Sequence, residues 1–201
     1  NYRMFLLEGD AKYYDVLERT LYNALLSGIS LSADRFFYPN PLESHGEHNR
    51  KAWFGCACCP SNICRFIPSV PGYVYAQKGD SLYVNLFMNN VATVDLKGDQ
   101  VTIEQVTEYP WSGKITFKVN PVKPGKFNLL VRIPGWAQNQ ALPTSLYTFA
   151  TNDKEKATLR LNGKGTALEI KNGYAVISRE WKKRDRLVLE LSMPVRELAA
   201  N

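Results

Sequence analysis

Residues 72–106 read GYVYAQKGDSLYVNLFMNNVATVDLKGDQVTIEQV, and they carry the clearest signal of the fold class. Runs rich in Val, Tyr, Leu and Thr alternate with turn sequences such as Lys78-Gly79-Asp80 and Lys97-Gly98-Asp99. β-branched and aromatic residues favour strands, whereas Gly and Asp favour tight turns. This stretch therefore predicts short strands joined by hairpins.

The same alternation continues along most of the remaining chain. The expected strands are 73–76, 82–88, 92–96, 101–106, 114–119, 127–133, 157–161, 174–178 and 187–191. Many short strands at this spacing predict an antiparallel β-sandwich. Residues 138–156 are polar and lack a clear period, so we expect a long loop there.

Residues before about 70 show helical spacing instead. Tyr14, Leu17 and Leu21 recur every three or four residues, and Asp10 stands where an N-cap is expected. Gly28 then provides a stop signal. Residues 1–7 look like a helix entered midway that breaks at a glycine, because no capping residue precedes their apolar run.

A third helix is expected to start at Pro60, since proline is favoured at the first helical position, where its missing N–H costs nothing. Pro68 and Pro71 should end it. The sequence thus predicts an α+β chain, helical over residues 1–70 and a β-sandwich over residues 71–201.

Composition excludes few classes of function. The chain has 201 residues, and its 25 Lys and Arg against 19 Asp and Glu give a net charge of +6. The basic residues are scattered, and the densest run, 182–186, suits a solvated turn, so we do not expect a nucleic-acid partner. No segment has the roughly 20 apolar residues of a membrane helix, so we expect no membrane partner. No signal-peptide pattern opens the chain, and the compartment stays open.

All the cysteines, Cys56, Cys58, Cys59 and Cys64, fall within nine residues. A disulfide framework would spread its cysteines along the chain, so this clustering favours metal or thiol chemistry. With a helix starting at Pro60, Cys59 would lie near its N-cap and Cys58 just before. Unpaired N–H groups and the helix dipole would favour a thiolate at both positions.

A zinc ion would also hold these thiols deprotonated, but it needs four ligands, and no second cysteine cluster is present. His45 and His48 are the nearest other candidates. Histidines in a polar loop are more often solvated than bound to a metal, and that is the ordinary interpretation here. The ordinary interpretation of Cys56 and Cys64 is likewise that of small apolar residues.

Residues 34–44 read DRFFYPNPLES, and residues 53–60 read WFGCACCP. These two stretches resemble glycoside hydrolase family 127, the β-L-arabinofuranosidase family. Residues 9–23 and 82–86 are also similar, and the likeness covers residues 1 to about 135. The consecutive cysteines are the most specific part of the motif.

The resemblance implies an (α/α)6 barrel followed by β-sandwiches, and a zinc enzyme that cleaves an arabinose-containing glycan or glycoside with retention. It implies Cys58 as nucleophile and zinc ligand, Cys59 as zinc ligand, and Tyr38 as a residue that contacts the sugar. The other ligands, a Glu and a Cys, and the acid/base Glu would lie upstream of residue 1. We therefore expect residues 1–70 to be the end of the barrel, the isolated chain to be inactive, and its uncovered apolar surface to favour self-association.

Two other classes of function stay open at this point. A carbohydrate-binding or structural β-sandwich module could stack sugars on Trp111, Trp136 and Trp181, although core packing explains tryptophans more often. An exposed aromatic row would favour such a module. A thiol-redox or structural zinc protein is the third class, and it would use Cys58 paired with Cys59 or Cys56.

Overall fold

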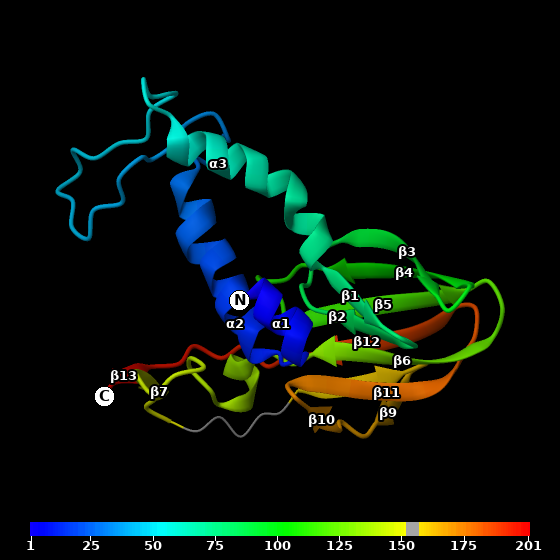
Figure 1. Cartoon of the computed structure of the whole chain (residues 1–201). Helices are drawn as coiled ribbons and strands as arrows, with labels where there is room; N and C mark the ends of the chain where they lie inside the picture. The colour runs from blue at the N-terminus through cyan, green and yellow to red at the C-terminus, as the bar shows by residue number, and fades with distance from the viewer. Residues whose placement is uncertain (152–156) are drawn as a thin grey trace.

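The computed structural model of the chain describes residues 1–151 and 157–201. Its helices are α1 (Tyr2–Glu8), α2 (Lys12–Arg19) and α3 (Cys58–Phe66). A π-helical turn η1 (Thr20–Leu25) and a 3-10 turn η2 (Leu26–Gly28) extend α2, a 3-10 segment η3 (Ile67–Tyr73) extends α3, and a 3-10 turn η4 (Gly135–Gln138) follows the sixth strand. Figure 1 shows α2 and α3 projecting away from the sheets.

The first two helices end where the sequence predicts. Gly9 ends α1 in the left-handed region at φ 70°, where glycine carries no Cβ penalty. Gly28 ends the extension of α2. Asp10 accepts a hydrogen bond from the Lys12 N–H at 2.9 Å, although Ala11 and not Asp10 is the N-cap residue.

The prediction for the third helix was wrong at its start. It begins at Cys58, with Ala57 as its N-cap, so Pro60 lies at the third position. Proline fits there because the N–H groups of the first turn have no intrahelical partner. The α-helix ends at Phe66, just before Pro68, as predicted. The chain then continues in 3-10 geometry, and Pro68 and Pro71 lie within η3.

Short strands follow η3 along the rest of the chain. They are β1 (Tyr75–Lys78), β2 (Ser81–Val84), β3 (Asn90–Leu96), β4 (Asp99–Thr107), β5 (Lys114–Pro121), β6 (Gly125–Arg132), β7 (Tyr147–Phe149), β8 (Thr158–Leu161), β9 (Lys164–Thr166), β10 (Ile170–Lys171), β11 (Tyr174–Trp181), β12 (Asp185–Glu190) and β13 (Leu198–Ala200). Each predicted strand overlaps one of these. The short strands β7, β9, β10 and β13 were not predicted, because two or three residues are too few to show a period.

The strands form two main sheets, in the orders β1-β2-β6-β11-β10 and β3-β4-β5-β12-β8-β9, with a small pair β13-β7 beside them. The α+β class with a β-sandwich is confirmed. One pairing departs from the antiparallel rule, since β2 runs parallel to β6. The expected loop over 138–156 contains β7, and its residues 152–156 lie outside the described residues.

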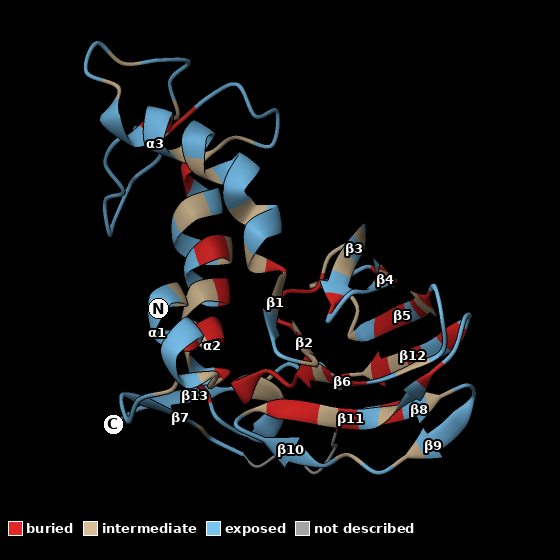
Figure 2. Ribbon diagram, turned by 45° about the vertical axis from the view of Figure 1, so that its right-hand side comes forward, coloured by how far each residue is buried: buried red, intermediate tan, exposed pale blue. Residues whose placement is uncertain are grey.

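Two apolar cores hold the chain together. The larger fills the space between the sheets and includes Ile103, Phe117 and Leu129, each fully buried. The smaller joins the helices to the sandwich through Tyr14 of α2 and Tyr174 of β11, also fully buried. Figure 2 shows that buried residues are concentrated in the strands and along α2, whereas α3 is mostly exposed. None of the helices in the described residues is both long and apolar enough to cross a membrane.

A buried ion-pair network also connects the helices to the sandwich. The Arg132 side chain on β6 is fully buried and donates from Nη1 to Asp15 Oδ1 at 2.8 Å and from Nη2 to Glu18 Oε1 at 2.5 Å. Its Nε donates to the Asn85 carbonyl at 2.6 Å. Asp15 and Glu18 are three residues apart, so both face the sandwich from one side of α2. The network fixes the rotation of α2 against β6.

Gly173 allows close contact between α2 and the turn before β11. It has φ +77°, and a Cβ added there would lie 2.4 Å from the Ala11 Cβ. We expect Gly173→Ala to lower the free energy of unfolding by about 1–2 kcal/mol for the positive φ and a further 1–3 kcal/mol for overpacking. Gly163→Ala is the matched control, because Gly163 has φ +83° with no atom within 4 Å. Urea unfolding of both variants measures the difference, and equal losses would contradict a close contact at Ala11.

Candidate active site

Cys58 and Cys59 begin α3, at the end of the helical part that is far from the sheets and beside the loop of residues 29–57 (Figure 1). All four cysteines are free and exposed. Cys58 and Cys59 are the first two residues of α3, so their N–H groups have no intrahelical acceptor. The helix starts two residues earlier than predicted, which places both thiols inside its first turn.

Tyr38 reaches the first of these thiols from the loop. Its hydroxyl lies 2.7 Å from the Cys58 sulfur, although the two residues are 20 positions apart. The Tyr38 ring also lies against Phe54, with 5.5 Å between ring centroids. The structure thus brings together the two residues that the sequence motif marks as nucleophile and sugar contact.

The contact favours a thiolate on Cys58. The Tyr38 hydroxyl is the main cause that lowers the pKa of the Cys58 thiol, partial desolvation opposes it, and Cys59 and the N–H groups of both cysteines add to the lowering. The same contact raises the pKa of Tyr38 to about 12, so the hydroxyl stays protonated and donates a hydrogen bond to the sulfur.

The prediction that the helix start favours a thiolate at both positions is wrong for Cys59. Desolvation and the adjacent Cys58 charge raise the pKa of the Cys59 thiol. Two neighbouring thiols oppose each other's ionisation, and the helix terminus cannot favour both equally. Without a metal, the pair therefore carries its first negative charge on Cys58.

Side chains further along α3 hold the backbone of the nucleophile candidate. Asn62 donates from Nδ2 to the Cys58 carbonyl at 2.7 Å, and the Ser61 hydroxyl donates to the same oxygen at 3.1 Å. Arg65 in turn donates to Asn62 Oδ1. Sequence reasoning missed this chain of contacts, although the four-residue spacing from Cys58 to Asn62 would place them on one helix face.

The remaining cysteines differ in their distance from the pair. Cys56 is close enough for its charge to raise the pKa of both Tyr38 and Cys59. Cys64 is exposed on α3, about two turns beyond the pair. Both are exposed, so the interpretation of Cys56 and Cys64 as small apolar residues of a core is wrong.

The histidines make other contacts. His48 Nε2 lies 3.0 Å from the Pro39 carbonyl, and the His48 ring stacks on Phe37. His45 Nε2 lies 3.7 Å from a Glu43 oxygen in full exposure. Among the residues that the structure describes, no group of three or more His, Cys, Asp or Glu side chains could hold a metal ion. Cys58 and Cys59 together offer two sulfur donors of the kind that zinc prefers. Two donors are half of a tetrahedral set.

The tryptophans do not form an exposed row. Trp181 is fully buried and donates from Nε1 to the Phe127 carbonyl. Trp136 is partly buried against the core, and of the three proposed stacking residues Trp111 alone is exposed. This arrangement does not support a sugar-binding face made by these residues.

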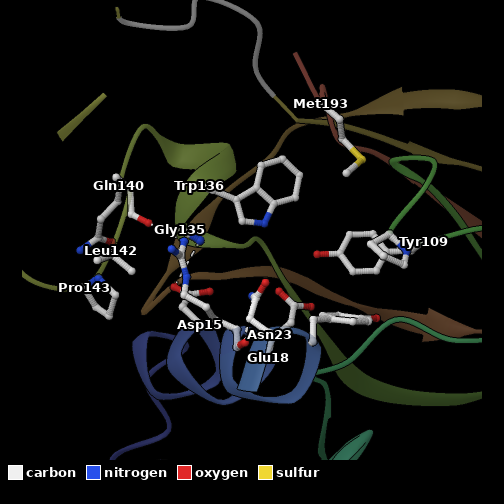
Figure 3. Close-up of a pocket in the computed structure, with 14 residues that line it drawn as sticks. Asp15, Glu18, Asn23, Tyr109, Gly135, Trp136, Gln140, Leu142, Pro143 and Met193 are labelled. Atoms are coloured by element: carbon white, nitrogen blue, oxygen red, sulfur yellow. Dashed lines mark hydrogen bonds between the residues drawn. The ribbon is translucent and has the colours of Figure 1, made fainter. Parts of the chain in front are cut away.

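A cavity of about 370 Å³ lies elsewhere, between α2 and the segment after β6. In Figure 3 the Trp136 and Tyr109 rings face the carboxylates of Asp15 and Glu18 across it. Neither Tyr38 nor a cysteine lines this cavity. It is therefore separate from the thiol site.

Comparison with known proteins gives the family. Residues 1–72 match the "Beta-L-arabinofuranosidase, GH127 catalytic domain" and residues 81–193 match the "Beta-L-arabinofuranosidase, GH127 middle domain". A non-reducing end β-L-arabinofuranosidase of Bifidobacterium longum subsp. longum is 30% identical, over 99% of this chain and 30% of that protein.

Two solved structures are also similar over the whole chain. A GH127 β-arabinofuranosidase shares 50% identity at a TM-score of 0.95, over 100% of this chain and 32% of that one. A GH127 β-L-arabinofuranosidase from Geobacillus stearothermophilus T6 shares 38% identity at a TM-score of 0.85, over 100% of this chain and 31% of that one. The chain thus spans about a third of the length of these relatives. By its matches along both the helical part and the sandwich, the chain belongs to glycoside hydrolase family 127.

Proposed function

We propose that this chain supplies the nucleophile of a retaining β-L-arabinofuranosidase, and that the nucleophile is the Cys58 thiolate. The observation that carries the proposal is the Tyr38 hydroxyl placed 2.7 Å from the Cys58 sulfur at the first turn of α3. The family relatives include enzymes named as β-L-arabinofuranosidases, which supports a terminal arabinofuranoside as substrate.

The proposed reaction has two displacements. The Cys58 sulfur attacks the anomeric carbon, a C–S bond forms, and the C–O bond to the leaving group breaks while a carboxylic acid gives that oxygen its proton. Water then attacks the same carbon, its proton passes to the carboxylate, and the thiolate leaves. Two inversions give net retention. The acid is expected from outside residues 1–201, as the family resemblance implies.

Residues of this chain perform three tasks in that scheme. Tyr38 donates to sulfur, which favours the anion before attack and after departure of the sugar. Asn62 and Ser61 hold the Cys58 carbonyl and so fix the start of α3. Phe54 packs on the Tyr38 ring and limits its motion.

Zinc is part of the proposal, with Cys58 and Cys59 as two of its ligands. When bound, zinc would keep both thiols deprotonated, which the mutual repulsion between Cys58 and Cys59 otherwise opposes. The remaining ligands are expected to be a Glu and a Cys outside residues 1–201.

A comparison of the isolated chain with the intact protein tests this proposal. We expect the intact protein to hold about one zinc per molecule and to hydrolyse an aryl β-L-arabinofuranoside. The isolated chain should bind zinc weakly and give no turnover, because two sulfur donors do not complete a zinc site. Elemental analysis and release of the aryl group measure both. Hydrolysis by residues 1–201 alone, or an active intact protein without metal, would contradict the proposal.

A further inference from the structure

The loop that carries Tyr38 is exposed but tied at its base. Phe36 forms backbone bridges to Ile29 and Lys51. Its N–H donates to the Lys51 carbonyl at 2.8 Å, and the Lys51 N–H donates back at 2.9 Å. The Phe37 N–H donates to the Gly28 carbonyl at 3.0 Å. The backbone is therefore held up to the residue before Tyr38.

The side chain of Phe37 is held by two residues of the segment that returns toward α3. The His48 ring stacks on it at 4.7 Å between centroids and 16° between planes. The Arg50 guanidinium carbon lies 4.2 Å from the Phe37 ring centroid, a cation–π contact. We call Phe37, His48 and Arg50 the aromatic clamp. Over residues 37–53 the clamp members are the ones with partly buried side chains, and every other residue is exposed.

The clamp also holds the residue after Tyr38. His48 Nε2 lies 3.0 Å from the Pro39 carbonyl, and as that oxygen can only accept, the ring donates. Arg50 Nη2 donates to the Ser27 carbonyl at 2.7 Å, which ties the clamp to the end of the α2 extension. The backbone is thus fixed on both sides of Tyr38.

Tyr38 itself has one polar partner, the Cys58 sulfur, and one ring partner, the tilted Phe54 ring, and 37% of its surface is exposed. Ordering an exposed side chain costs conformational entropy. A loop that orders its neighbours in advance removes part of that cost.

We propose that His48, through the aromatic clamp, is a positioning residue that holds the Tyr38 hydroxyl on the Cys58 sulfur. This inference rests on the proposed function for its catalytic consequence, although the clamp itself rests on the contacts alone. It gives His48 a role that does not require a metal ion.

A double-mutant cycle in the intact protein tests the coupling. We expect His48→Ala to lower kcat about tenfold, because the sulfur loses its hydrogen-bond partner, and to change KM no more than Tyr38→Phe does, because both remove the hydroxyl from its place. In a Tyr38→Phe background the same substitution should lower kcat less than twofold, because no hydroxyl is left to position. Equal factors in the two backgrounds would overturn the proposal.

His45→Ala is the matched control, because His45 lies in the same loop with a fully exposed side chain and one long contact to Glu43. It should leave kcat unchanged, and a loss equal to that of His48→Ala would overturn the proposal by pointing to the loop as a whole. If His48→Ala folds poorly, His48→Leu replaces it in the cycle under the same criterion, since leucine fills similar space but cannot donate to the Pro39 carbonyl.

A second readout separates this inference from the proposed function. The rate of Cys58 alkylation by iodoacetamide, followed by peptide mapping on the metal-free chain, needs no glycosidase activity. His48→Ala should slow it to the Tyr38→Phe rate and add nothing to Tyr38→Phe. That result with an inactive intact protein would leave the clamp and remove the glycosidase proposal. Independent effects of His48→Ala and Tyr38→Phe on the alkylation rate, in an active protein, would overturn the clamp and leave the glycosidase proposal in place.

Discussion

Cys58→Ala is expected to lower hydrolysis of an aryl β-L-arabinofuranoside by the intact protein by about 10³-fold or more. The substitution removes the protein atom proposed to bond to the anomeric carbon, and loss of a nucleophile costs more than loss of a group that assists it. Cys58→Ser should be nearly as inactive, because a hydroxyl at the start of α3 remains protonated where a thiol ionises.

Cys64→Ala is the matched control for this prediction. Cys64 is a free, exposed cysteine on the same helix, so its removal changes the thiol count without changing the first turn of α3. We expect its kcat and zinc content to match those of the unchanged protein. Aryl release and elemental analysis measure both.

Loss of activity in Cys58→Ala could also follow from loss of a zinc ligand, so a covalent label is the decisive measurement. Acid quenching during turnover should give a peptide containing Cys58 that is heavier by one pentosyl group. Cys59→Ala removes a proposed ligand and leaves the nucleophile in place, so any label it forms should still be on Cys58. A label on another residue, or near-normal turnover by Cys58→Ala, would show that a different group attacks the sugar.

The sandwich was predictable because its strands are long enough to show a period. In β4 the buried residues Val101, Ile103 and Gln105 alternate with more exposed ones, as a strand with one face on the core requires. The parallel pairing of β2 with β6 was not predictable, because strand order depends on contacts between segments about 45 residues apart and no local pattern records it.

The thiol site was predictable only in part. Consecutive cysteines next to a helix start indicate thiolate chemistry from local physics, and the motif added Tyr38 by resemblance. Its distance to Cys58 could not be derived, because it depends on the path of an exposed loop. The aromatic clamp could not be predicted for the same reason. Phe37 and His48 come into contact across an irregular loop, and such a loop has no sequence period.

The buried network was missed because charged residues are ordinarily assigned to the surface. Asp15 and Glu18 have helical spacing that marks a shared face, but Arg132 lies more than 110 positions away. Only the packing of α2 on β6 brings the three charges together. The same packing shapes the cavity beside Trp136. From the sequence, Trp136 was considered only as a residue that stacks on a sugar or packs in the core.

Arg132→Met is expected to lower the free energy of unfolding by about 3–5 kcal/mol, the usual cost of removing one partner from a buried ion pair. Burial disfavours the charged guanidinium, yet the attraction of Glu18 and Asp15 outweighs it and raises the pKa of Arg132. Without that charge, two carboxylates remain buried, and the Asn85 carbonyl loses its donor.

A matched exposed pair sets the scale for this loss. Lys118 Nζ lies 2.8 Å from Glu104 Oε1 across β4 and β5, and both side chains are partly exposed. Lys118→Met removes the same charge and should cost less than about 1 kcal/mol, because solvent screens the pair. Urea unfolding with equal m-values compares the two variants, and similar losses would mean that the Arg132 network contributes no more than a surface contact.

The pH dependence identifies the buried carboxylate as the cause. Desolvation raises the pKa of Asp15 above its unfolded value, although Arg132 lowers it in part. A raised carboxyl pKa means that the folded state binds more protons than the unfolded state, so stability is present at low pH and falls as pH rises through the folded pKa. Removal of Arg132 raises the Asp15 pKa further and widens the pH range over which stability falls.

The stability deficit of Arg132→Met should therefore shrink as pH falls from 7 toward 4. In addition, Asp15→Asn with Glu18→Gln should restore much of the stability of Arg132→Met at pH 7. A deficit that is constant with pH, and is not reduced by the two amides, would assign the loss to side-chain packing at β6 instead of to unpaired charge.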